Sequence, residues 1–338
     1  MKTDTQFDVS AIGELLIDFT QNGLSQQGNW MLEANPGGAP CNVLAMLTKL
    51  GHKTAFIGQV GNDMFGQMLK ERVEKLGINL DGLVMSDTEK TTLAFVHTAP
   101  DGDRSFSFYR NPGADASLAK EKVNTNILCA SKILHYGTLS MTNEPVNSAT
   151  EFALAVAKKN NVLLSFDPNL RPPLWKHPDE SVAQGLARAK ERIMFGLSQC
   201  DVLKIADEEV EFITGEKEIA QGVATLRNKY NIPLITVTMG KKGCHAFYDN
   251  GRTTLDEQCP TFTNVKTIDT TGAGDTFGAC ILHDLLVNGY DDFDKQRMHG
   301  MLVFANAASS LITTRKGALS VMPDRKEIEK LIHCSTVI

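Results

Sequence analysis

Residues 269–277 of this 338-residue chain are Asp-Thr-Thr-Gly-Ala-Gly-Asp-Thr-Phe, and residues 276–287 have the apolar spacing of a helix. Glycines such as Gly272 and Gly274 allow the backbone to approach a ligand closely. Gly272, Ala273, Gly274 and Asp275 would therefore lie at a helix N-terminus, where unpaired N–H groups and the helix dipole favour an anion. Beside such an anion site, the carboxylate of Asp275 can accept a proton from a hydroxyl while the N–H groups stabilise phosphate charge.

The same residues allow two other interpretations. Asp275 is also suited to cap the helix, because Asp is common at helix N-termini. Gly272, Gly274 and Gly278 nearly fit a dinucleotide-binding fingerprint, but the third glycine is one place late and no clear strand–helix–strand unit follows. A Walker P-loop of the form GxxxxGK[ST] does not occur in the chain.

A second glycine cluster precedes another predicted helix. Residues 35–42 are Asn-Pro-Gly-Gly-Ala-Pro-Cys-Asn, and residues 58–66 are Gly-Gln-Val-Gly-Asn-Asp-Met-Phe-Gly. Paired glycines before a helix expose backbone N–H groups, and Asn42 would direct its amide toward the ligand edge of a sheet. Taken alone, this cluster fits a tight connection into the helix as well as it fits a binding site.

Short apolar segments alternate with helical ones along most of the chain. We expect strands at residues 9–19, 54–60, 133–136, 162–166, 202–205 and 234–238. We expect helices at residues 42–50, 63–76, 144–159, 180–197, 208–229, 275–288 and 294–312, the second capped by Asn62 or Asp63. The alternation predicts an α/β fold with a mostly parallel central sheet, and the lack of a linker predicts one domain over residues 1–338.

Two stretches interrupt this alternation. Residues 91–97 and 105–109 alternate as strands do and are joined by Asp101-Gly102, a hairpin-type turn, whereas residues 21–35 are polar and irregular. We interpret the segments of about 19–35 and 90–115 as a small β-sheet lid over the main domain. An ordinary surface hairpin is the alternative.

Composition excludes several classes of protein. The net charge is −6, so a basic footprint for nucleic acid is missing. No apolar run approaches the ~20 residues of a membrane-spanning helix, and residues 1–8 do not resemble a signal peptide. The seven cysteines are scattered and form no CxxC pair, which argues against a disulfide framework and a structural zinc site. We therefore expect a cytoplasmic protein with reduced thiols and with no nucleic-acid or membrane partner.

The two glycine clusters together resemble the two signatures of the ribokinase-like (PfkB) sugar kinase family. The resemblance covers residues 9–323, nearly the whole chain, with both motifs in the family's order. It implies a three-layer α/β/α sandwich with a mostly parallel central sheet and a β lid, with ATP as phosphoryl donor and Mg²⁺. Asp275 resembles the catalytic base, and Gly272 to Asp275 resemble the anion hole for the transferred phosphate.

The resemblance implies roles for further residues. Sugar contacts would come from Asp18, Gly37, Gly38, Asn42, Phe108 and Arg110, in addition to Asp275. ATP contacts would come from Lys204, Glu209, Thr238, Gly240, Gly243, Gly272, Gly274 and Asn306. Asp269, Thr271 and Gly317 resemble a monovalent cation site, with K⁺ held mostly by backbone oxygens.

One motif departs from the family pattern. The family often has Asn-x-x-Glu before a Thr-Gly pair, linked to magnesium and phosphate, whereas this chain has Ala206-Asp-Glu-Glu209 before Thr214-Gly215. Glu209 would organise the waters of Mg²⁺, while the role of the asparagine is left without a residue. A solvated acidic helix start is the alternative for residues 207–209.

Within the family, the chain is most similar to fructokinases. The similarity lies in residues 13–19, 92–96, 101–106 and 108–115 and in Asp-Pro-Asn-Leu-Arg at 167–171. The last motif is shared with 2-keto-3-deoxygluconate kinases. Arg110 and Arg171 are candidates to reach substrate oxygens or the transferred phosphate, because a guanidinium presents several fixed donors. The resemblance implies phosphorylation of D-fructose at its 6-hydroxyl and a homodimer through the lid. A 2-keto-3-deoxygluconate kinase and a non-catalytic sugar or nucleotide sensor are the alternatives.

Overall fold

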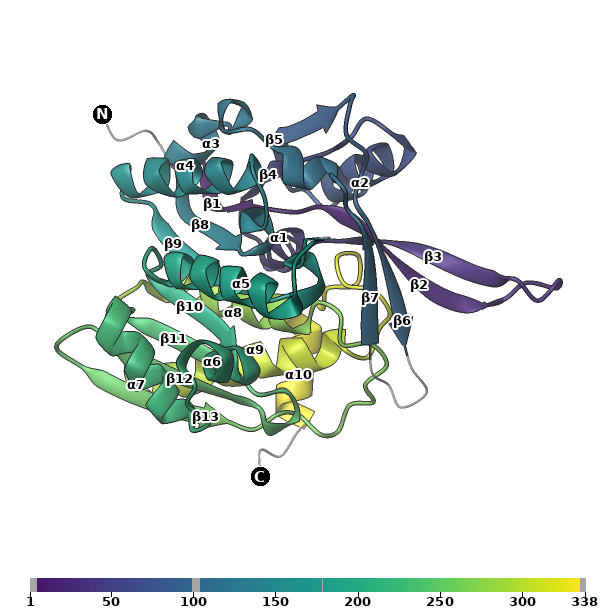
Figure 1. The fold of residues 1–338 in the computed structure, drawn as a ribbon. Coiled ribbons are helices and arrows are strands. Elements are labelled where there is room, and N and C mark those ends of the chain that lie inside the picture. Colours follow the sequence, from purple (N-terminus) through teal and green to yellow (C-terminus); the bar gives the residue numbers. More distant parts are fainter. Residues whose placement is uncertain (1–4, 99–103, 178, 335–338) are drawn as a thin grey trace.

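A computed structural model describes residues 5–98, 104–177 and 179–334 of the chain. It contains a large sheet with helices packed against it and a small second sheet (Figure 1). Within these residues the larger sheet has nine strands in the order β13-β12-β11-β10-β9-β8-β1-β4-β5. Its strands are β1 (Phe7–Ile12), β4 (Thr54–Gly61), β5 (Asn79–Ser86), β8 (Ser131–Gly137), β9 (Leu163–Asp167), β10 (Val202–Ala206), β11 (Leu234–Thr238), β12 (Cys244–Asp249) and β13 (Thr254–Cys259). Every neighbouring pair from β5 to β11 is parallel, and β12 and β13 extend the sheet antiparallel.

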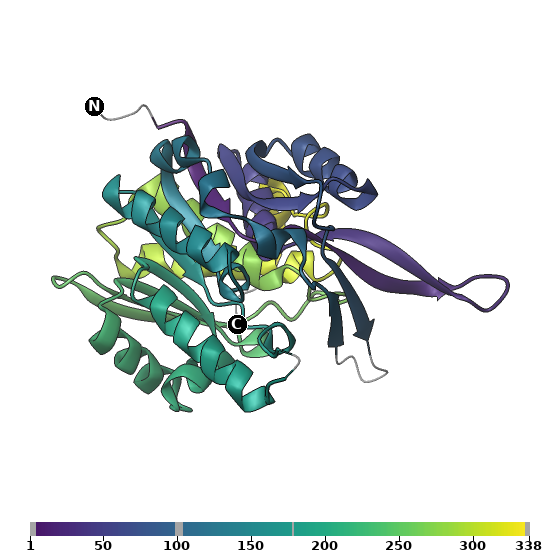
Figure 2. The ribbon, with the colours of Figure 1, turned by 45° about the horizontal axis from the view of Figure 1, so that its top comes forward.

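Helices cover both faces of this sheet, as the alternating sequence predicts. One face carries α1 (Ala39–Lys49), α2 (Met64–Lys75), α8 (Ala273–Asn288), α9 (Lys295–Ile312) and α10 (Arg325–Cys334). The other carries α3 (Thr125–Cys129), α4 (Val146–Lys159), α5 (Val182–Leu197), α6 (Asp207–Thr214) and α7 (Ile219–Tyr230). Figures 1 and 2 show α4, α5 and α7 on the opposite side of the sheet from α8 and α9. The expected α/β/α sandwich is therefore confirmed.

The central strands are apolar throughout because both of their faces are buried. Along β10, Val202 packs into the core beneath α8 and α9, while Leu203 packs into the core beneath α5 and α6. Leu234 and Ile235 divide in the same way on β11. Strands buried on both faces form continuous apolar runs rather than alternating ones, which is why the sequence marks these strands so clearly.

The second sheet has four strands in the order β3-β2-β6-β7. They are β2 (Leu16–Leu24), β3 (Trp30–Gly37), β6 (Leu93–Thr98) and β7 (Arg104–Tyr109). In both ribbon views β2 and β3 project away from the layered body as a long hairpin (Figures 1 and 2). The expected lid segments thus form one sheet, while the predicted Asp101-Gly102 turn lies outside the described residues.

Three sequence expectations about elements are wrong. Residues 9–19 form two strands, because the chain leaves the large sheet at Gly13 and enters the small one as β2. Residues 21–35 are not irregular but contain the outer end of β2 and most of β3, which are exposed and lack the apolar alternation of a half-buried strand. Residues 208–229 form two helices, since Gly215 ends α6 with a left-handed φ of 80°.

Other elements gave too little signal to be expected from the sequence. These are β5, α10 and the antiparallel strands β12 and β13. The N-cap of α2 agrees with expectation: Asp63 accepts hydrogen bonds from the N–H groups of Phe65 and Gly66. Asp294 caps α9 in the same way and accepts a hydrogen bond from the Arg297 N–H. No helix in the described part of the chain is long and apolar enough to cross a membrane.

Candidate active site

The candidate site lies at the carboxyl ends of the parallel strands, where ligands bind in sheets of this type. β9 ends at Asp167, β11 ends at Thr238, and β10 carries Lys204. The N-terminus of α8 comes to the same edge: a Cβ added to Gly274 would lie 2.9 Å from Lys204 Nζ. The fold therefore brings residues about 70 positions apart in sequence into one site.

The first turn of α8 differs from a simple capped helix. Gly272 is the N-cap, with a left-handed φ of 77°, and it makes no side-chain cap bond. A Cβ on Gly272 would also lie 2.6 Å from the Cβ of Ala318, so only glycine fits this position. Ala273 donates its N–H to the Thr270 carbonyl at 3.3 Å. The amides of Gly274 and Asp275, which lack intrahelical acceptors, are thus the better anion donors.

Asp275 lies inside the helix, not at its cap, and its carboxylate is held by Asn42. Asn42 Nδ2 donates to Asp275 Oδ2 at 2.8 Å from α1, which packs beside α8. Burial raises the pKa of Asp275 to about 6, and the negative charge of Asp167 adds to this rise. The Asn42 hydrogen bond and the positive charges of Lys204 and Arg171 oppose the rise. A carboxylate with this pKa is ionised near neutral pH and basic enough to accept a proton.

Asn42 also carries an unused acceptor beside Asp275. Its side chain is 4% exposed, and within the described residues its Oδ1 has no hydrogen-bond partner. A buried acceptor without a partner costs free energy, so it indicates a donor group missing from the protein chain. A hydroxyl of a bound substrate would supply that donor next to the Asp275 carboxylate.

Lys204, Asp167 and Glu209 form a buried charged group behind Asp275. Lys204 Nζ lies 3.0 Å from Asp167 Oδ2. Burial acts to lower the pKa of Lys204, but the charges of Asp167 and Glu209 outweigh it and raise that pKa. Lys204 therefore stays protonated and supplies a fixed positive charge close to Gly274.

Glu209 is not on a solvated helix face, which was the alternative interpretation of residues 207–209. Its side chain is buried, and its two carboxylate oxygens accept hydrogen bonds from the N–H groups of Leu170 (2.7 Å) and Ala206 (2.9 Å). Burial raises the pKa of Glu209. Within the described residues no cluster of three or more His, Cys, Asp or Glu side chains could hold a metal ion.

The predicted sugar residues Asp18, Gly37 and Gly38 lie together where β2 meets the start of α1. A Cβ on Gly37 would lie 2.1 Å from Asp18 Oδ2, so the carboxylate rests on the glycine backbone. Gly38 has a φ of 123°, and a Cβ there would lie 2.4 Å from the carbonyl oxygen of Glu14. These two glycines let α1, with Asn42 on it, begin directly beside Asp18.

The two arginines occupy different surroundings. Arg110 is 3% exposed and bonds Asp115 (Nη2 to Oδ2, 2.7 Å), Thr142 (2.7 Å) and the Leu139 carbonyl (3.0 Å). It therefore anchors the end of the second sheet to the body of the protein. Arg171 donates to the Leu170 carbonyl at 3.2 Å, and its positive charge acts on Asp275. Phe108, on β7 opposite Ala94, is half-buried.

The other four predicted nucleotide residues, which are Thr238, Gly240, Gly243 and Asn306, lie around Cys244. Thr238 pairs with Cys244 across β11 and β12, and Gly240 and Gly243 flank the short turn between them with positive φ values. Asn306 of α9 donates to Cys244 Sγ at 3.2 Å, and also to the carbonyls of Cys259 and Pro260 at 3.2 Å each. The amide nitrogen of Asn306 is thus committed to binding β12 and β13.

Asp269, Thr271 and Gly317, the predicted monovalent cation site, are joined by the carboxylate of Asp269. Its Oδ1 accepts from the Thr271 N–H at 2.7 Å and its Oδ2 from the Gly317 N–H at 3.1 Å. This carboxylate fastens the two loops beside the N-terminus of α8. The carbonyls of these loops are the groups that could face a cation.

Two buried acids of the site were not among the expected site residues. Asp167 ends β9, and its signal was a carboxylate at a strand end. Glu14 follows β1, accepts a hydrogen bond from the Ala39 N–H at 2.9 Å, and so fixes the start of α1. Burial raises the pKa of Glu14 to about 7. The available sign was a charged residue directly before the apolar run Leu15-Leu16-Ile17.

Comparison with known proteins matches this architecture. Residues 6–325 match the model described as pfkB family carbohydrate kinase. The chain belongs to this family, whose members are sugar kinases that transfer a phosphoryl group to an alcohol. The ribokinase-like features expected from the sequence are thereby confirmed.

Within this family, individual relatives named fructokinase are similar to the chain over nearly its whole length. The chain is 38% identical to fructokinase-2 of Solanum habrochaites, over 96% of this chain and 95% of that protein. The crystal structure of a Xylella fastidiosa fructokinase with bound ATP superposes with a TM-score of 0.83, at 31% identity, covering 96% of this chain and 98% of that one. A double mutant of Vibrio cholerae O395 fructokinase, with fructose, ADP and potassium ion, has a TM-score of 0.82 at 29% identity and covers 98% and 99%.

Proposed function

We propose that the protein is an ATP-dependent fructokinase that phosphorylates the 6-hydroxyl of D-fructose. The relatives named fructokinase, one of them solved with fructose and ADP, support this choice of sugar. The observation that carries the chemistry is the buried Asp275 carboxylate, held by Asn42 at the N-terminus of α8.

Asp275 accepts the proton of the sugar's primary hydroxyl. Its raised pKa of about 6 leaves it mostly ionised at neutral pH yet more basic than an exposed carboxylate. Asn42 holds one Asp275 oxygen, while its own Oδ1 accepts a hydrogen bond from a second sugar hydroxyl. Asp18 binds further hydroxyls from the side of the second sheet, beside Gly37 and Gly38.

The N-terminus of α8 stabilises the phosphoryl group in transit. The amides of Gly274 and Asp275 donate to the oxygens on which charge develops, with Gly272 and Ala273 shaping the turn. Lys204 adds a fixed positive charge beside Gly274, and Arg171 adds another near Asp275. Positioning and electrostatics of this kind supply most of the catalysis in phosphoryl transfer.

The residues present fit Mg²⁺ as a cofactor held mainly through ATP. Mg²⁺ keeps several waters and takes only one or two carboxylates when it binds nucleotide phosphates. Asp167 and Glu209 offer such carboxylates, although each is partly committed to bonds within the protein. When bound, the ion neutralises phosphate charge.

K⁺ fits the loops fastened by Asp269, with Thr271 and Gly317 presenting backbone oxygens. The bound potassium ion in the Vibrio cholerae structure supports testing it. The nucleotide would lie along Thr238, Gly240 and Gly243 and reach Asn306.

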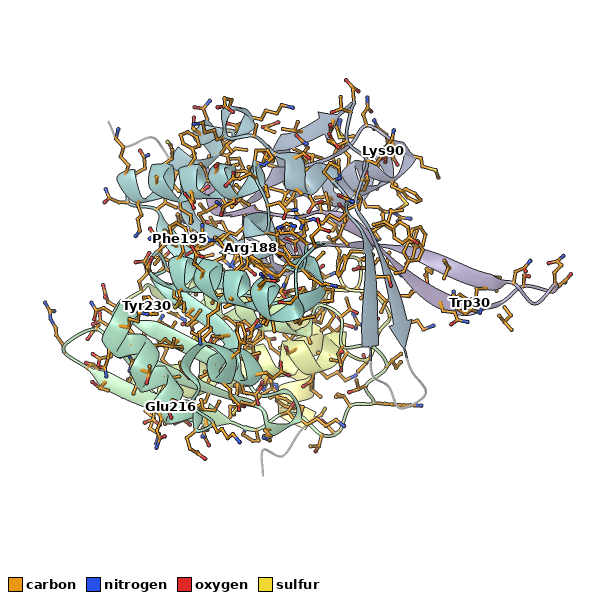
Figure 3. All side chains as sticks on the ribbon, in the orientation of Figure 1. Trp30, Lys90, Arg188, Phe195, Glu216 and Tyr230 are labelled. Carbon is orange, nitrogen blue, oxygen red and sulfur yellow. The ribbon has the colours of Figure 1, made fainter. Side chains whose placement is uncertain are left out.

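The second sheet serves, in this proposal, as a lid over the sugar and as the contact between two copies of the chain. Trp30 is 68% exposed on the projecting hairpin of β2 and β3, well away from the layered body (Figure 3). Leu24, Met31 and Leu32 are also exposed there, at 56%, 46% and 43%. Contiguous exposed apolar side chains of this kind mark an interaction surface.

We place the protein in the cytoplasm, as one domain over residues 1–338. All seven cysteines are free, which suits a reducing compartment.

A coupled ADP assay on a panel of sugars tests the proposal. We expect D-fructose to have the highest kcat/KM, above 2-keto-3-deoxygluconate, ribose and glucose. Asp275→Asn should lower kcat about 10²–10⁴-fold, the contribution usual for a general base, while the fold survives. Glu208→Gln is the matched control, because it also replaces a carboxylate by its amide, but on an exposed residue of α6.

Three results would contradict this proposal. A preference for 2-keto-3-deoxygluconate would change the substrate, and turnover on none of the sugars would favour a sensor. Near-native turnover by Asp275→Asn would remove the assigned base.

A further inference from the structure

We propose that Cys244 and Cys259 are a redox-sensitive pair, which a hydroperoxide converts into a disulfide that weakens ATP binding. The first part concerns the thiols alone, and the second rests on the proposed function of the neighbouring site. Neither cysteine has a part in the sugar kinase chemistry described above.

The strand register places the two cysteines opposite each other. Cys244 begins β12 and Cys259 ends β13, and they are directly paired across this antiparallel ladder. Directly opposed residues have Cα atoms about 4.5–5.5 Å apart and side chains on the same face, within the range that a disulfide spans. Both thiols are free: Cys244 Sγ accepts a hydrogen bond from Asn306 Nδ2 at 3.2 Å, and Cys259 Sγ donates to the Pro260 carbonyl at 3.6 Å.

The surroundings make the two thiols chemically unequal. The neighbouring Cys244 thiol lowers the pKa of Cys259, burial opposes this effect, and Asn306 and the charge of His299 add to it. The interaction with Cys259 and burial raise the pKa of Cys244. Burial instead raises the pKa of Cys200 and Cys280. Cys259 is therefore the thiolate-forming member, and a thiolate is the form that reacts with peroxide.

The pair is positioned for limited access by a small oxidant. Cys259 is 3% exposed and Cys244 is fully buried. β13 is the edge strand of the large sheet, so it has no strand beyond it to hold it in place. A hydroperoxide can reach the Cys259 end when this edge opens.

The reaction balances with hydrogen peroxide as the oxidant. The Cys259 thiolate attacks one oxygen, the O–O bond breaks, and the released hydroxide takes a proton to become water, leaving a sulfenic acid. Cys244 sulfur then attacks the Cys259 sulfur, the S–O bond breaks, and the hydroxide leaves as water with the Cys244 proton. Two thiols lose two electrons and two protons, and one peroxide becomes two waters.

Disulfide formation would disturb the nucleotide end of the site. Opposed Cβ atoms about 4.5–5.5 Å apart must approach to about 3.8 Å, which draws β12 and β13 together. Gly243 lies close against the Cys259 carbonyl, since a Cβ added there would be 2.1 Å from that oxygen, so a movement of Cys259 is passed on to the turn that ends at Gly243. Asn306 would also lose the Cys244 thiol geometry that it now bonds at 3.2 Å. The Gly240–Lys242 turn and Asn306 would therefore shift together.

Mass spectrometry of the wild-type protein tests the disulfide directly. The full chain is freed of reductant, treated with hydrogen peroxide, and alkylated before and after dithiothreitol. We expect a loss of two hydrogens, about 2 Da, and a peptide that joins Cys244 to Cys259. Retention of both thiols, or oxidation to sulfinic acid without this cross-link, would overturn the proposal. This measurement does not depend on kinase activity.

Steady-state kinetics test the effect on ATP. In the oxidised protein we expect the KM for ATP to rise about fivefold or more, with the KM for the sugar unchanged and full recovery after dithiothreitol. Cys244→Ser and Cys259→Ser should each abolish the response, whereas Cys200→Ser should keep it. A cross-linked protein with an unchanged KM for ATP would refute the coupling. Absence of turnover before oxidation would refute the proposed function. The disulfide would then be tested by the mass measurement alone.

Discussion

The hydrogen bond from Asn42 to Asp275 should set the pH at which the enzyme loses activity in acid. Asn42 Nδ2 lies 2.8 Å from Asp275 Oδ2, and this bond opposes the rise in the pKa of Asp275 that burial produces. Replacement of Asn42 by alanine removes a donor that favours the ionised carboxylate. The pKa of Asp275 should therefore rise above its value of about 6.

The size of the shift follows from the type of bond. A hydrogen bond to a charged group contributes about 1.5–3 kcal/mol, and one pKa unit corresponds to about 1.4 kcal/mol. Water that enters the space left by the amide would recover part of this, so we expect the lower end, a rise of about one pKa unit. The apparent pKa on the acid side should then move from about 6 to about 7.

The assay is kcat/KM for the sugar between pH 5 and 9 at saturating ATP, since its profile reports groups of the free enzyme. Asn288→Ala is the matched control, because Asn288 makes the same kind of bond to Asp284 (2.7 Å) at the exposed far end of α8. Protonation of the ATP phosphates affects all variants equally, so it does not change the comparison between them. A lower kcat/KM in Asn42→Ala with an unmoved or lowered acid limb would refute this reasoning.

Three other perturbations give measurable outcomes. Gly38→Ala forces a side chain into a φ of 123° and toward the Glu14 carbonyl, so it should destabilise the fold by about 1–3 kcal/mol and raise the KM for the sugar. Lys204→Met leaves Asp167 as an uncompensated buried charge and should lower the free energy of unfolding by about 3–5 kcal/mol in urea titrations. Burial lowers the pKa of His135 from 6.5 to about 4. Between these two pH values the unfolded chain binds more protons than the folded one, so the free energy of unfolding decreases as the pH is lowered. The loss between pH 7 and 4 should reach about 3 kcal/mol, and His135→Asn should remove it.

Each of these perturbations has a control. Gly215→Ala meets no atom within 4 Å at a φ of 80°, so it should cost only the strain of the backbone. Lys132→Met removes a half-exposed partner of Asp8 and should cost less than about 1 kcal/mol. Equal effects of the buried and exposed exchanges would contradict the burial argument. For His135, an unchanged pH dependence in the variant would assign the loss to other groups.

Local sequence patterns predicted the layered sheet because its strands are buried on both faces. Residues 202–205 and 234–238 are short apolar runs, and the structure places strands there. The edge strand β13 was not predicted, because it carries the polar residues Thr254, Asp256 and Gln258 on its exposed face. The neighbouring β12 was missed although five of its six residues are buried. The break at Gly13 was missed because the apolar residues on both sides of it are buried, although in different sheets.

Part of the candidate site was likewise predicted from local sequence, and part depended on residues distant in the chain. The glycines around Asp275 predicted an anion-binding helix end, since positive φ and unpaired amides belong to a few neighbouring residues. The sequence could not decide whether Asp275 caps the helix or serves as a base. The structure shows Gly272 at the cap and Asn42, from a distant helix, on the Asp275 carboxylate.

The sequence by itself therefore determined the parts that depend on near neighbours: the layered α/β fold, a glycine-rich helix end with unpaired amides, and the family resemblance. Only the tertiary structure decided the charge state of the site. The pKa of Asp275 depends on burial and on Asp167, Lys204 and Arg171, which come from other parts of the chain. Electrostatic energies depend on distance in space and on exclusion of water, and neither quantity is written in the order of the residues.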